Sequence, residues 1–385
     1  MGLAGGMTST PRRARSTPAG WHLRNDTVRA YLTRVGGQLG PVFFRLGRRE
    51  VQPFSIAPWQ GEKLPGIPAM LRILRGDFFC APFGGNDTPF RGERHPPHGE
   101  TANRAWTLAG RSRAGGASGL HAVMKTRIRK GVVDKRITLR DGHAAVYCEH
   151  VLSGFEGPMC LGTHPMLRFP DIEGSGIVSV SGFTRGWVVP DPWETPEKRG
   201  YHALRLGAGF TSLRRVPARD GGTADLSRFP ARRGFEDLVL LKGDPSQPFA
   251  WSAVSFPAEG HVFFSLKNPR VLRHTVLWIS NGGRHYPPWN GRHVNVLGLE
   301  EVTSFFHLGL AESAGRNLLN RAGIPTAENL DPLHPTRVAH ILAMAATPRG
   351  FGEVVRIVPS PGGVTLVSRE GKRVFAPLDL EFVSR

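Results

Sequence analysis

The sequence is poor in cysteine and has no long apolar segment. Its 385 residues include three cysteines, and no two of them form a Cys-x-x-Cys pair. An odd number without such a pair argues against a disulfide framework and favours a reducing compartment. No apolar run approaches the length of about 20 residues that a membrane-spanning helix needs. The basic residues 1–20 lack the apolar segment of a secretion signal. We therefore expect a cytoplasmic protein that does not bind membranes.

Acidic residues are scarce as well. The chain has 31 Asp and Glu against 50 Lys and Arg, which gives a formal net charge of +19. Such an excess can attract nucleic acid, and binding would then weaken steeply with salt. It can equally follow from a coding bias towards Arg, Gly, Ala and Pro. The basic residues are scattered, with one dense group at residues 11–15, so the second interpretation is favoured and nucleic acid is not the expected partner.

Helical periodicity and phosphate-binding loops are missing too. There is no regular alternation of strands and helices, which disfavours a doubly wound sheet. The glycine-rich residues 115–119 lack the lysine of a phosphate loop, and no Gly-x-Ser-x-Gly motif occurs. Residues 335–346 begin with a proline and could form either a helix or a strand. Residues 302–319 have mixed periodicity and could contain one short helix.

Turn-forming residues and short apolar runs are abundant instead. Gly 48 and Pro 32 together exceed a fifth of the chain and are spread along it. Between them lie strand-length runs rich in β-branched and aromatic residues, at 41–46, 143–148, 176–181, 260–266, 276–280, 353–358 and 363–367. The pattern predicts an all-β protein, one large β-sandwich over residues 21–385 after a disordered basic tail at 1–20. The loops at 187–200 and 217–235 are expected to be surface excursions.

Residues 95–106 contain an unusual number of polar and aromatic side chains. His95, His98, Glu100, Asn103 and Trp106 lie within twelve positions. Planar hydrogen-bonding groups beside an aromatic ring are typical of carbohydrate sites. An imidazole with an ordinary pKa near 6.5 can donate or accept protons at neutral pH, but a surface histidine in a proline-rich loop explains His98 equally well. The spacing matches no strong zinc motif, so neither a metal nor a cofactor is expected.

Two further segments add an imidazole and a carboxylate. His164 precedes a proline, which holds it extended, and it is either a functional group or a core histidine. Glu300 and Glu301 follow a strand-like run, so one side chain should face inward, where a carboxylate must be paired, protonated or used. The sequence does not fix which of the two it is. Aromatic residues gather near these segments, as sugar sites and single-stranded nucleic-acid sites both require: Trp59, Trp106, Trp278, Tyr286 and Trp289.

In this order the segments resemble the aldose 1-epimerase (galactose mutarotase-like) superfamily. The resemblance rests on short motifs, which are His98-Gly99 with Trp106, Thr163-His164-Pro165 with Phe169, a late strand ending at Glu300, and Arg75-Gly76-Asp77-Phe78. The chain departs from the family where residues 166–169 read Met-Leu-Arg-Phe in place of Tyr-Phe-Asn-Leu. The family's substrate-binding aspartate has two candidates, Asp237 and Asp244.

The resemblance implies a β-supersandwich with an open groove and an isomerase that interconverts the α and β anomers of a sugar. Glu300 would take the proton of the anomeric hydroxyl, and His164 would protonate the ring oxygen. Substrate binding is expected from the other motif residues and their neighbours, namely His98, Arg75, Trp106, Glu100, Asn103 and Trp289. A non-catalytic carbohydrate-binding protein of the same fold is the alternative, and a nucleic-acid-binding protein is a third. The sequence carries no signal for an oligomeric state.

Overall fold

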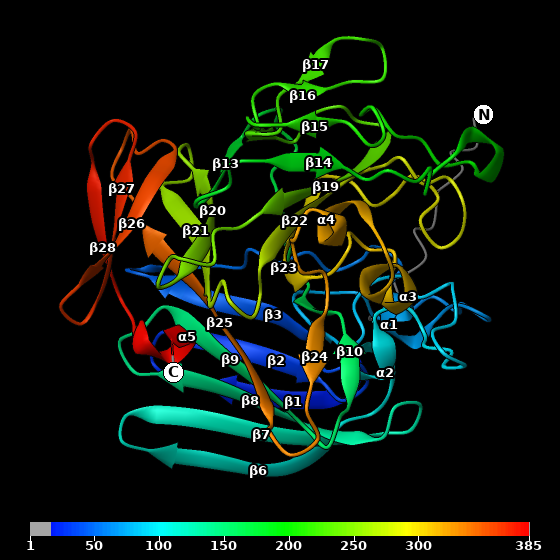
Figure 1. Cartoon of the computed structure of the whole chain (residues 1–385). Helices are drawn as coiled ribbons and strands as arrows, with labels where there is room; N and C mark the ends of the chain where they lie inside the picture. The colour runs from blue at the N-terminus through cyan, green and yellow to red at the C-terminus, as the bar shows by residue number, and fades with distance from the viewer. Residues whose placement is uncertain (1–16, 385) are drawn as a thin grey trace, which may run out of the picture.

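The computed structural model describes residues 17–384, and its core is a sandwich of two large sheets (Figure 1). Within these residues, one sheet runs β18-β13-β20-β21-β25-β9-β8-β7-β6, and every neighbouring pair is antiparallel. Its strands are β6 (Thr107–Ala114), β7 (Ala117–Thr126), β8 (Gly131–Arg140), β9 (Ala145–Ser153), β13 (Gly176–Val180), β18 (Arg228–Phe229), β20 (Ala250–Phe256), β21 (His261–Lys267) and β25 (Thr336–Ala346).

The second large sheet has eight strands among residues 17–384. It runs β15-β14-β19-β22-β23-β11-β5, and β12 also pairs with β23. Its strands are β5 (Phe79–Cys80), β11 (Leu161–Thr163), β12 (Met166–Arg168), β14 (Gly186–Val188), β15 (Gly209–Phe210), β19 (Phe235–Lys242), β22 (His274–Asn281) and β23 (Val296–Thr303). All eight residues of β22 and of β23 are buried, so this sheet is covered on both faces.

Smaller sheets and short helices surround the sandwich. The first strands, β1 (Gly20–Arg24), β2 (Val28–Thr33), β3 (Leu39–Leu46) and β4 (Arg49–Val51), form a meander. The last strands, β26 (Val354–Ser360), β27 (Gly363–Ser368) and β28 (Arg373–Pro377), stand together at one side of the molecule in Figure 1. Two pairs remain, β10 (Gly157–Met159) with β24 (Glu328–Leu330) and β16 (Val216–Pro217) with β17 (Thr223–Ala224). The helices are α1 (Ala69–Arg72), α2 (Gly99–Asn103), α3 (Leu310–Ala314), α4 (Leu318–Arg321) and α5 (Glu381–Ser384), with a 3-10 turn at Pro196–Lys198.

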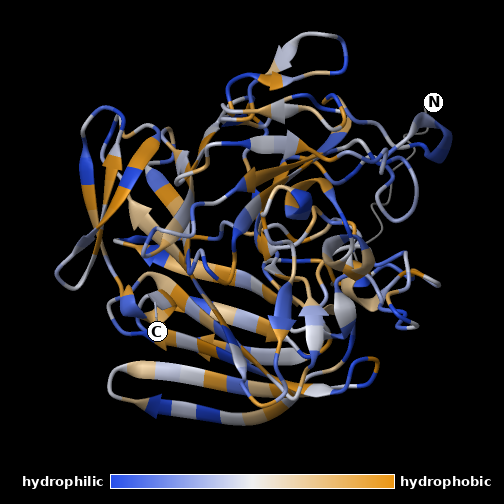
Figure 2. Ribbon diagram, in the orientation of Figure 1, coloured by the Kyte–Doolittle hydropathy of each residue, from blue (hydrophilic) through white to orange (hydrophobic). Residues whose placement is uncertain are grey.

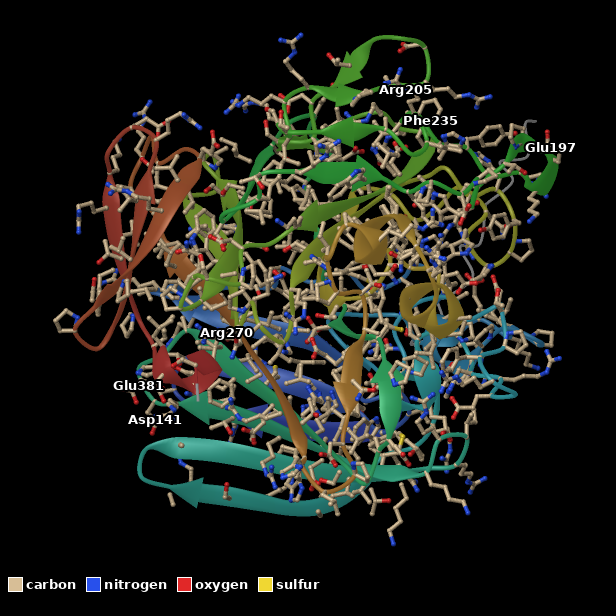
Figure 3. The ribbon with its side chains drawn as sticks, in the orientation of Figure 1. Asp141, Glu197, Arg205, Phe235, Arg270 and Glu381 are labelled. Atoms are coloured by element: carbon tan, nitrogen blue, oxygen red, sulfur yellow. The ribbon has the colours of Figure 1, made fainter. Side chains whose placement is uncertain are left out.

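The side chains follow the expected division between core and surface. Figure 2 shows apolar residues along the strands of the sandwich and mostly hydrophilic residues in the outer loops. The charged side chains of Glu197, Arg205 and Asp141 lie at the periphery in Figure 3 and are exposed. Burial of the apolar strand faces is therefore the main source of stability.

The all-β prediction is confirmed, and each predicted strand run falls on a strand. Residues 336–346 form β25, which settles the open choice in favour of a strand. Residues 302–319 overlap two short helices instead of one. The predicted disordered tail lies largely outside the described residues, and β1 already begins at Gly20. No helix among residues 17–384 has the length and apolar character needed to span a bilayer.

Candidate active site

A cavity of about 160 Å³ lies on the face of the second sheet that points away from the first sheet. Its lining joins residues from both halves of the chain, including His98, His164, Trp278, Arg284 and Glu300. Trp278 and Glu300 come from the adjacent strands β22 and β23, and His164 lies between β11 and β12. The sheet therefore supplies the floor and the loops supply the walls.

The centre of the cavity is a carboxylate–imidazole pair. The Nε2 atom of His164 lies 3.2 Å from the Oε1 atom of Glu300. Burial raises the pKa of Glu300 well above its usual range, and burial lowers the pKa of His164 well below its usual range. The pair therefore holds one proton between two groups, which makes one of them a donor and the other an acceptor. Acid–base chemistry on a single substrate requires such a proton donor and proton acceptor close together.

His164 is held by the segment that begins at Arg75. The backbone N–H of His164 donates to Oδ1 of Asp77 at 2.9 Å. The ring of Phe78 stacks on the imidazole, with 4.6 Å between centroids and 16° between planes. Asp77 is fixed in turn by Nε2 of His340, 3.0 Å from its Oδ2 atom. Asp77 and Phe78 thus position the imidazole.

Glu300 and Glu301 face opposite sides of β23. Glu301 is completely buried and forms an ion pair with Lys267 of the first sheet. It also accepts hydrogen bonds from Ser252 at 2.6 Å and Thr275 at 2.8 Å. Glu301 therefore lies between the two sheets, and Glu300 is the carboxylate in the cavity.

His98 and Trp289 also reach the cavity. The ring of His98 lies 4.9 Å from that of His164, edge to face. Burial lowers the pKa of His98 to about 3, so this histidine is neutral at working pH. Trp289 packs edge to face against Trp278 at 5.9 Å, and together the two indoles supply an apolar wall.

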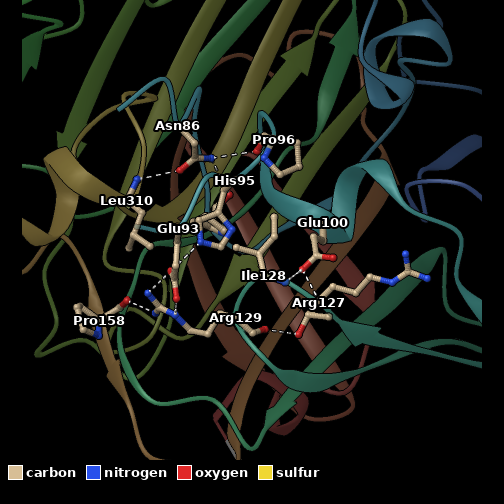
Figure 4. Close-up of polar contacts among 12 residues, drawn as sticks. Asn86, Glu93, His95, Pro96, Glu100, Arg127, Ile128, Arg129, Pro158 and Leu310 are labelled. Carbon is tan, nitrogen blue, oxygen red and sulfur yellow. Dashed lines mark hydrogen bonds and ion pairs between the residues drawn. The ribbon is translucent and has the colours of Figure 1, made fainter. Parts of the chain in front are cut away.

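Four predicted binding residues lie outside the cavity lining. Glu100 accepts from the backbone N–H groups of Arg127 and Ile128, at 2.8 and 3.0 Å (Figure 4). Asn103 donates to the carbonyl groups of Pro97 and Gly99. Glu100 and Asn103 therefore fix the loop that carries His98, and their hydrogen bonds are made within the protein.

The other two are Trp106 and Arg75. Trp106 is fully buried, and its indole N–H donates to the carbonyl of Thr101 at 3.0 Å. The Arg75 guanidinium hydrogen-bonds Gln60 and the carbonyl of Ile73, and it lines a separate hollow near the N-terminal strands. Neither side chain comes together with Glu300 and His164.

The sequence prediction missed the cationic side of the cavity. Arg284 and Trp193 line it, and Glu194 holds Arg284 through a hydrogen-bonded ion pair of 2.6 Å. The sequence pattern indicates Tyr286 and Trp289 as aromatic candidates nearby, but no signal singles out Arg284 between them and β22. Neither candidate aspartate lines the cavity. Asp237 accepts from the backbone N–H groups of residues 203 and 204, and Asp244 caps an exposed turn.

One group of potential metal ligands occurs among residues 17–384. Ligand atoms of Asp77, Cys148 and His340 all lie within 4.8 Å of one another. Asp77 and His340 already bond each other, and the buried cation Lys135 adds a positive charge to the same surroundings. The group is therefore accounted for as an internal polar network.

The metal alternative weighed for the first histidine segment does not assemble. His95 lies 2.9 Å from Glu93, which is also paired with Arg129 (Figure 4). Glu100 is engaged elsewhere, and His98 faces the cavity. His95, Glu100 and His98 thus have different surroundings and do not come together as one set of ligands.

Comparison with known proteins identifies solved structures with a similar fold. No protein-family model matches the sequence, and no curated protein matches it either. A protein of Escherichia coli, provisionally assigned as an aldose 1-epimerase, superposes with a TM-score of 0.57 at 13% identity, over 85% of this chain and 99% of its own. A galactose mutarotase related enzyme of Lactobacillus acidophilus gives 0.53 at 11%, over 86% and 99%. A galactose mutarotase-like protein of Lactobacillus casei gives 0.53 at 13%, over 85% and 100%.

At such identities the likeness concerns the fold alone. The resemblance inferred from the motifs is confirmed at that level, since the superposed proteins carry the names that the motifs suggested. The chain is a divergent protein of the galactose mutarotase-like fold.

Proposed function

We propose that the protein is an aldose 1-epimerase, an isomerase that interconverts the anomers of a sugar in the cavity around Glu300. The observation that carries the proposal is the Glu300–His164 pair, 3.2 Å apart in an aromatic cavity. Mutarotation needs one proton removed and one added on the same hemiacetal. A pair that shares one proton supplies both functions.

The steps balance without an external reactant. In the reactive form the shared proton lies on His164, so that Glu300 takes the proton from the anomeric hydroxyl while His164 gives its proton to the ring oxygen. The bond between C1 and the ring oxygen breaks, which leaves an open-chain aldehyde. Rotation about C1–C2 and the reverse proton transfers close the ring on the other face. The reaction requires neither a metal nor a cofactor, because no redox change or group transfer occurs.

Other cavity groups fit supporting roles. His98 is neutral and close to His164, so it can hydrogen-bond the ring oxygen or a neighbouring hydroxyl. The indole of Trp289 offers an apolar wall against which the C–H groups of a sugar ring can pack. We expect the reaction to take place in the cytoplasm, in keeping with three free, buried cysteines.

The test is the optical rotation of freshly dissolved α-anomers over a panel of hexoses, hexose phosphates and uronates. We expect faster equilibration with the wild-type protein and loss of the acceleration in Glu300→Gln. The matched control is Glu156→Gln, which changes an exposed carboxylate and should leave the rate unchanged. If the folded wild type accelerates no sugar, the enzyme proposal is wrong. Binding measured on the same panel would then point to a carbohydrate-binding protein.

A further inference from the structure

Arg284 is a buried cation fixed beside the Glu300 cavity. Its guanidinium carbon lies 4.4 Å from the ring centre of Trp289 and 4.7 Å from that of Trp193. Its Nε atom donates to Oε1 of Glu194 at 2.6 Å, and the two side chains are 13% and 3% exposed. The contacts with both indoles and the carboxylate leave the group little freedom of orientation.

The terminal nitrogens of Arg284 remain available. Among residues 17–384, neither Nη atom forms a hydrogen bond, and Arg284 lines the same cavity as Glu300. An arginine keeps its charge at any working pH. The cavity therefore contains a permanent positive charge with free donor groups.

The surrounding titratable groups offer no equivalent charge. Burial lowers the pKa of His98, His293 and His307 to about 3 in each case. His164 is shifted in the same direction. All four imidazoles are thus neutral in the empty cavity.

The acidic neighbours lie around Arg284 and behind Glu300. Burial raises the pKa of Glu236 to about 8, and its carboxyl group bonds the Trp278 indole and Ser280. Glu194 pairs directly with Arg284, and the Cys80 thiol and Asp77 lie behind Glu300 in the sheet interior. Of all these groups, Arg284 is the cation that counters burial at Glu300.

We propose that Arg284 is the counter-ion that allows Glu300 to act as a base, and that Glu194 holds Arg284 in place and shares its charge. Burial disfavours the ionised form of a carboxylate, and a nearby opposite charge favours it. Glu194 balances Arg284 during the part of the cycle in which Glu300 carries the proton. The catalytic meaning of this arrangement rests on the proposed epimerase function.

Two substitutions should change the reaction in opposite directions. Arg284→Gln removes the positive charge, so the acidic limb of the kcat–pH profile should move to higher pH by about one to three units, the range of a close charge partner. Glu194→Gln frees the positive charge to act on Glu300, so the limb should move to lower pH. Arg284→Lys keeps a charge without the planar stacking and should restore part of the shift.

Controls separate this effect from a loss of structure. Arg270→Gln, which removes an exposed arginine far from the cavity lining, should shift nothing. A general structural role would move both cavity variants the same way or reduce kcat at every pH without a shift. Either result, or an unchanged profile in both variants, overturns the proposal.

A second measurement does not depend on activity. The carboxyl titration of Glu300, followed by ¹³C nuclear magnetic resonance and assigned with Glu300→Gln, should show the same opposite shifts in the two variants. If no sugar is epimerised but the shifts occur, the proposed function fails and the role of Arg284 stands. If the enzyme is active and the shifts are absent, the role of Arg284 fails alone.

Discussion

The same substitution at the adjacent glutamates of β23 should reduce stability strongly at Glu301 and hardly at all at Glu300. Glu301 is 0% exposed and pairs with Lys267, which is 2% exposed. Glu301→Gln leaves that ammonium buried without an opposite charge, and breaking a buried pair in this way costs about 3–5 kcal/mol. Glu300 has no such cation bonded to it, and a glutamine in its place can still form a hydrogen bond with His164. Burial disfavours the Glu300 carboxylate, so Glu300→Gln should change stability by less than about 1 kcal/mol.

Urea unfolding at pH 7, followed by tryptophan fluorescence and circular dichroism together, measures the difference. The midpoint for Glu301→Gln should fall sharply with the slope unchanged, while that for Glu300→Gln stays near wild type. The double variant Lys267→Met with Glu301→Leu should recover much of the loss, because it removes both charges. An equal loss of stability in the two single variants would refute the assignment of Glu301 to the interior and Glu300 to the cavity.

Two other predictions concern Gly298 of β23 and His340 of β25. Gly298→Ala places a Cβ atom 2.6 Å from Oε1 of Glu300, so the carboxylate must move. We expect kcat for anomer interconversion to fall about 100-fold while the fold stays intact. A kcat within threefold of wild type would contradict this. Although burial opposes its charge, Cys148 and Asp77 hold the pKa of His340 at about 10. The stability that this histidine contributes is complete below its ordinary pKa near 6.5 and lost as pH rises through about 10. Urea midpoints measured between pH 6 and 10.5 should fall in the wild type and remain flatter in His340→Gln.

The fold was predictable because its elements have distinct local signals. Short runs of β-branched and aromatic residues between turns gave β21 and β22 directly. Residues 336–346 remained ambiguous because β25 pairs with both β21 and β9 and is buried on both faces. A strand in that position has a continuous apolar sequence, which periodicity alone does not separate from a buried helix.

The candidate site was only partly predictable because much of it is assembled over long separations. His98, His164 and Glu300 carry recognisable motifs, but Arg284 is held by Glu194, ninety positions earlier, in a loop without periodicity. Proximity in sequence to a motif residue also does not place a side chain in the cavity. Trp106 lies near His98 in the chain, yet its indole is directed into the core, where it bonds a backbone carbonyl.

Hydrogen-bond saturation distinguishes the two adjacent carboxylates of β23. Glu301 accepts from two hydroxyl groups and an ammonium, which occupies both oxygens. Within the described chain Glu300 has one polar partner, His164, so lone pairs remain for a ligand. A buried carboxylate in that state is costly unless a substrate completes its bonding. The alternation of one strand therefore places a fully bonded carboxylate and the proposed base at consecutive positions, and the number of bonds that each accepts distinguishes them.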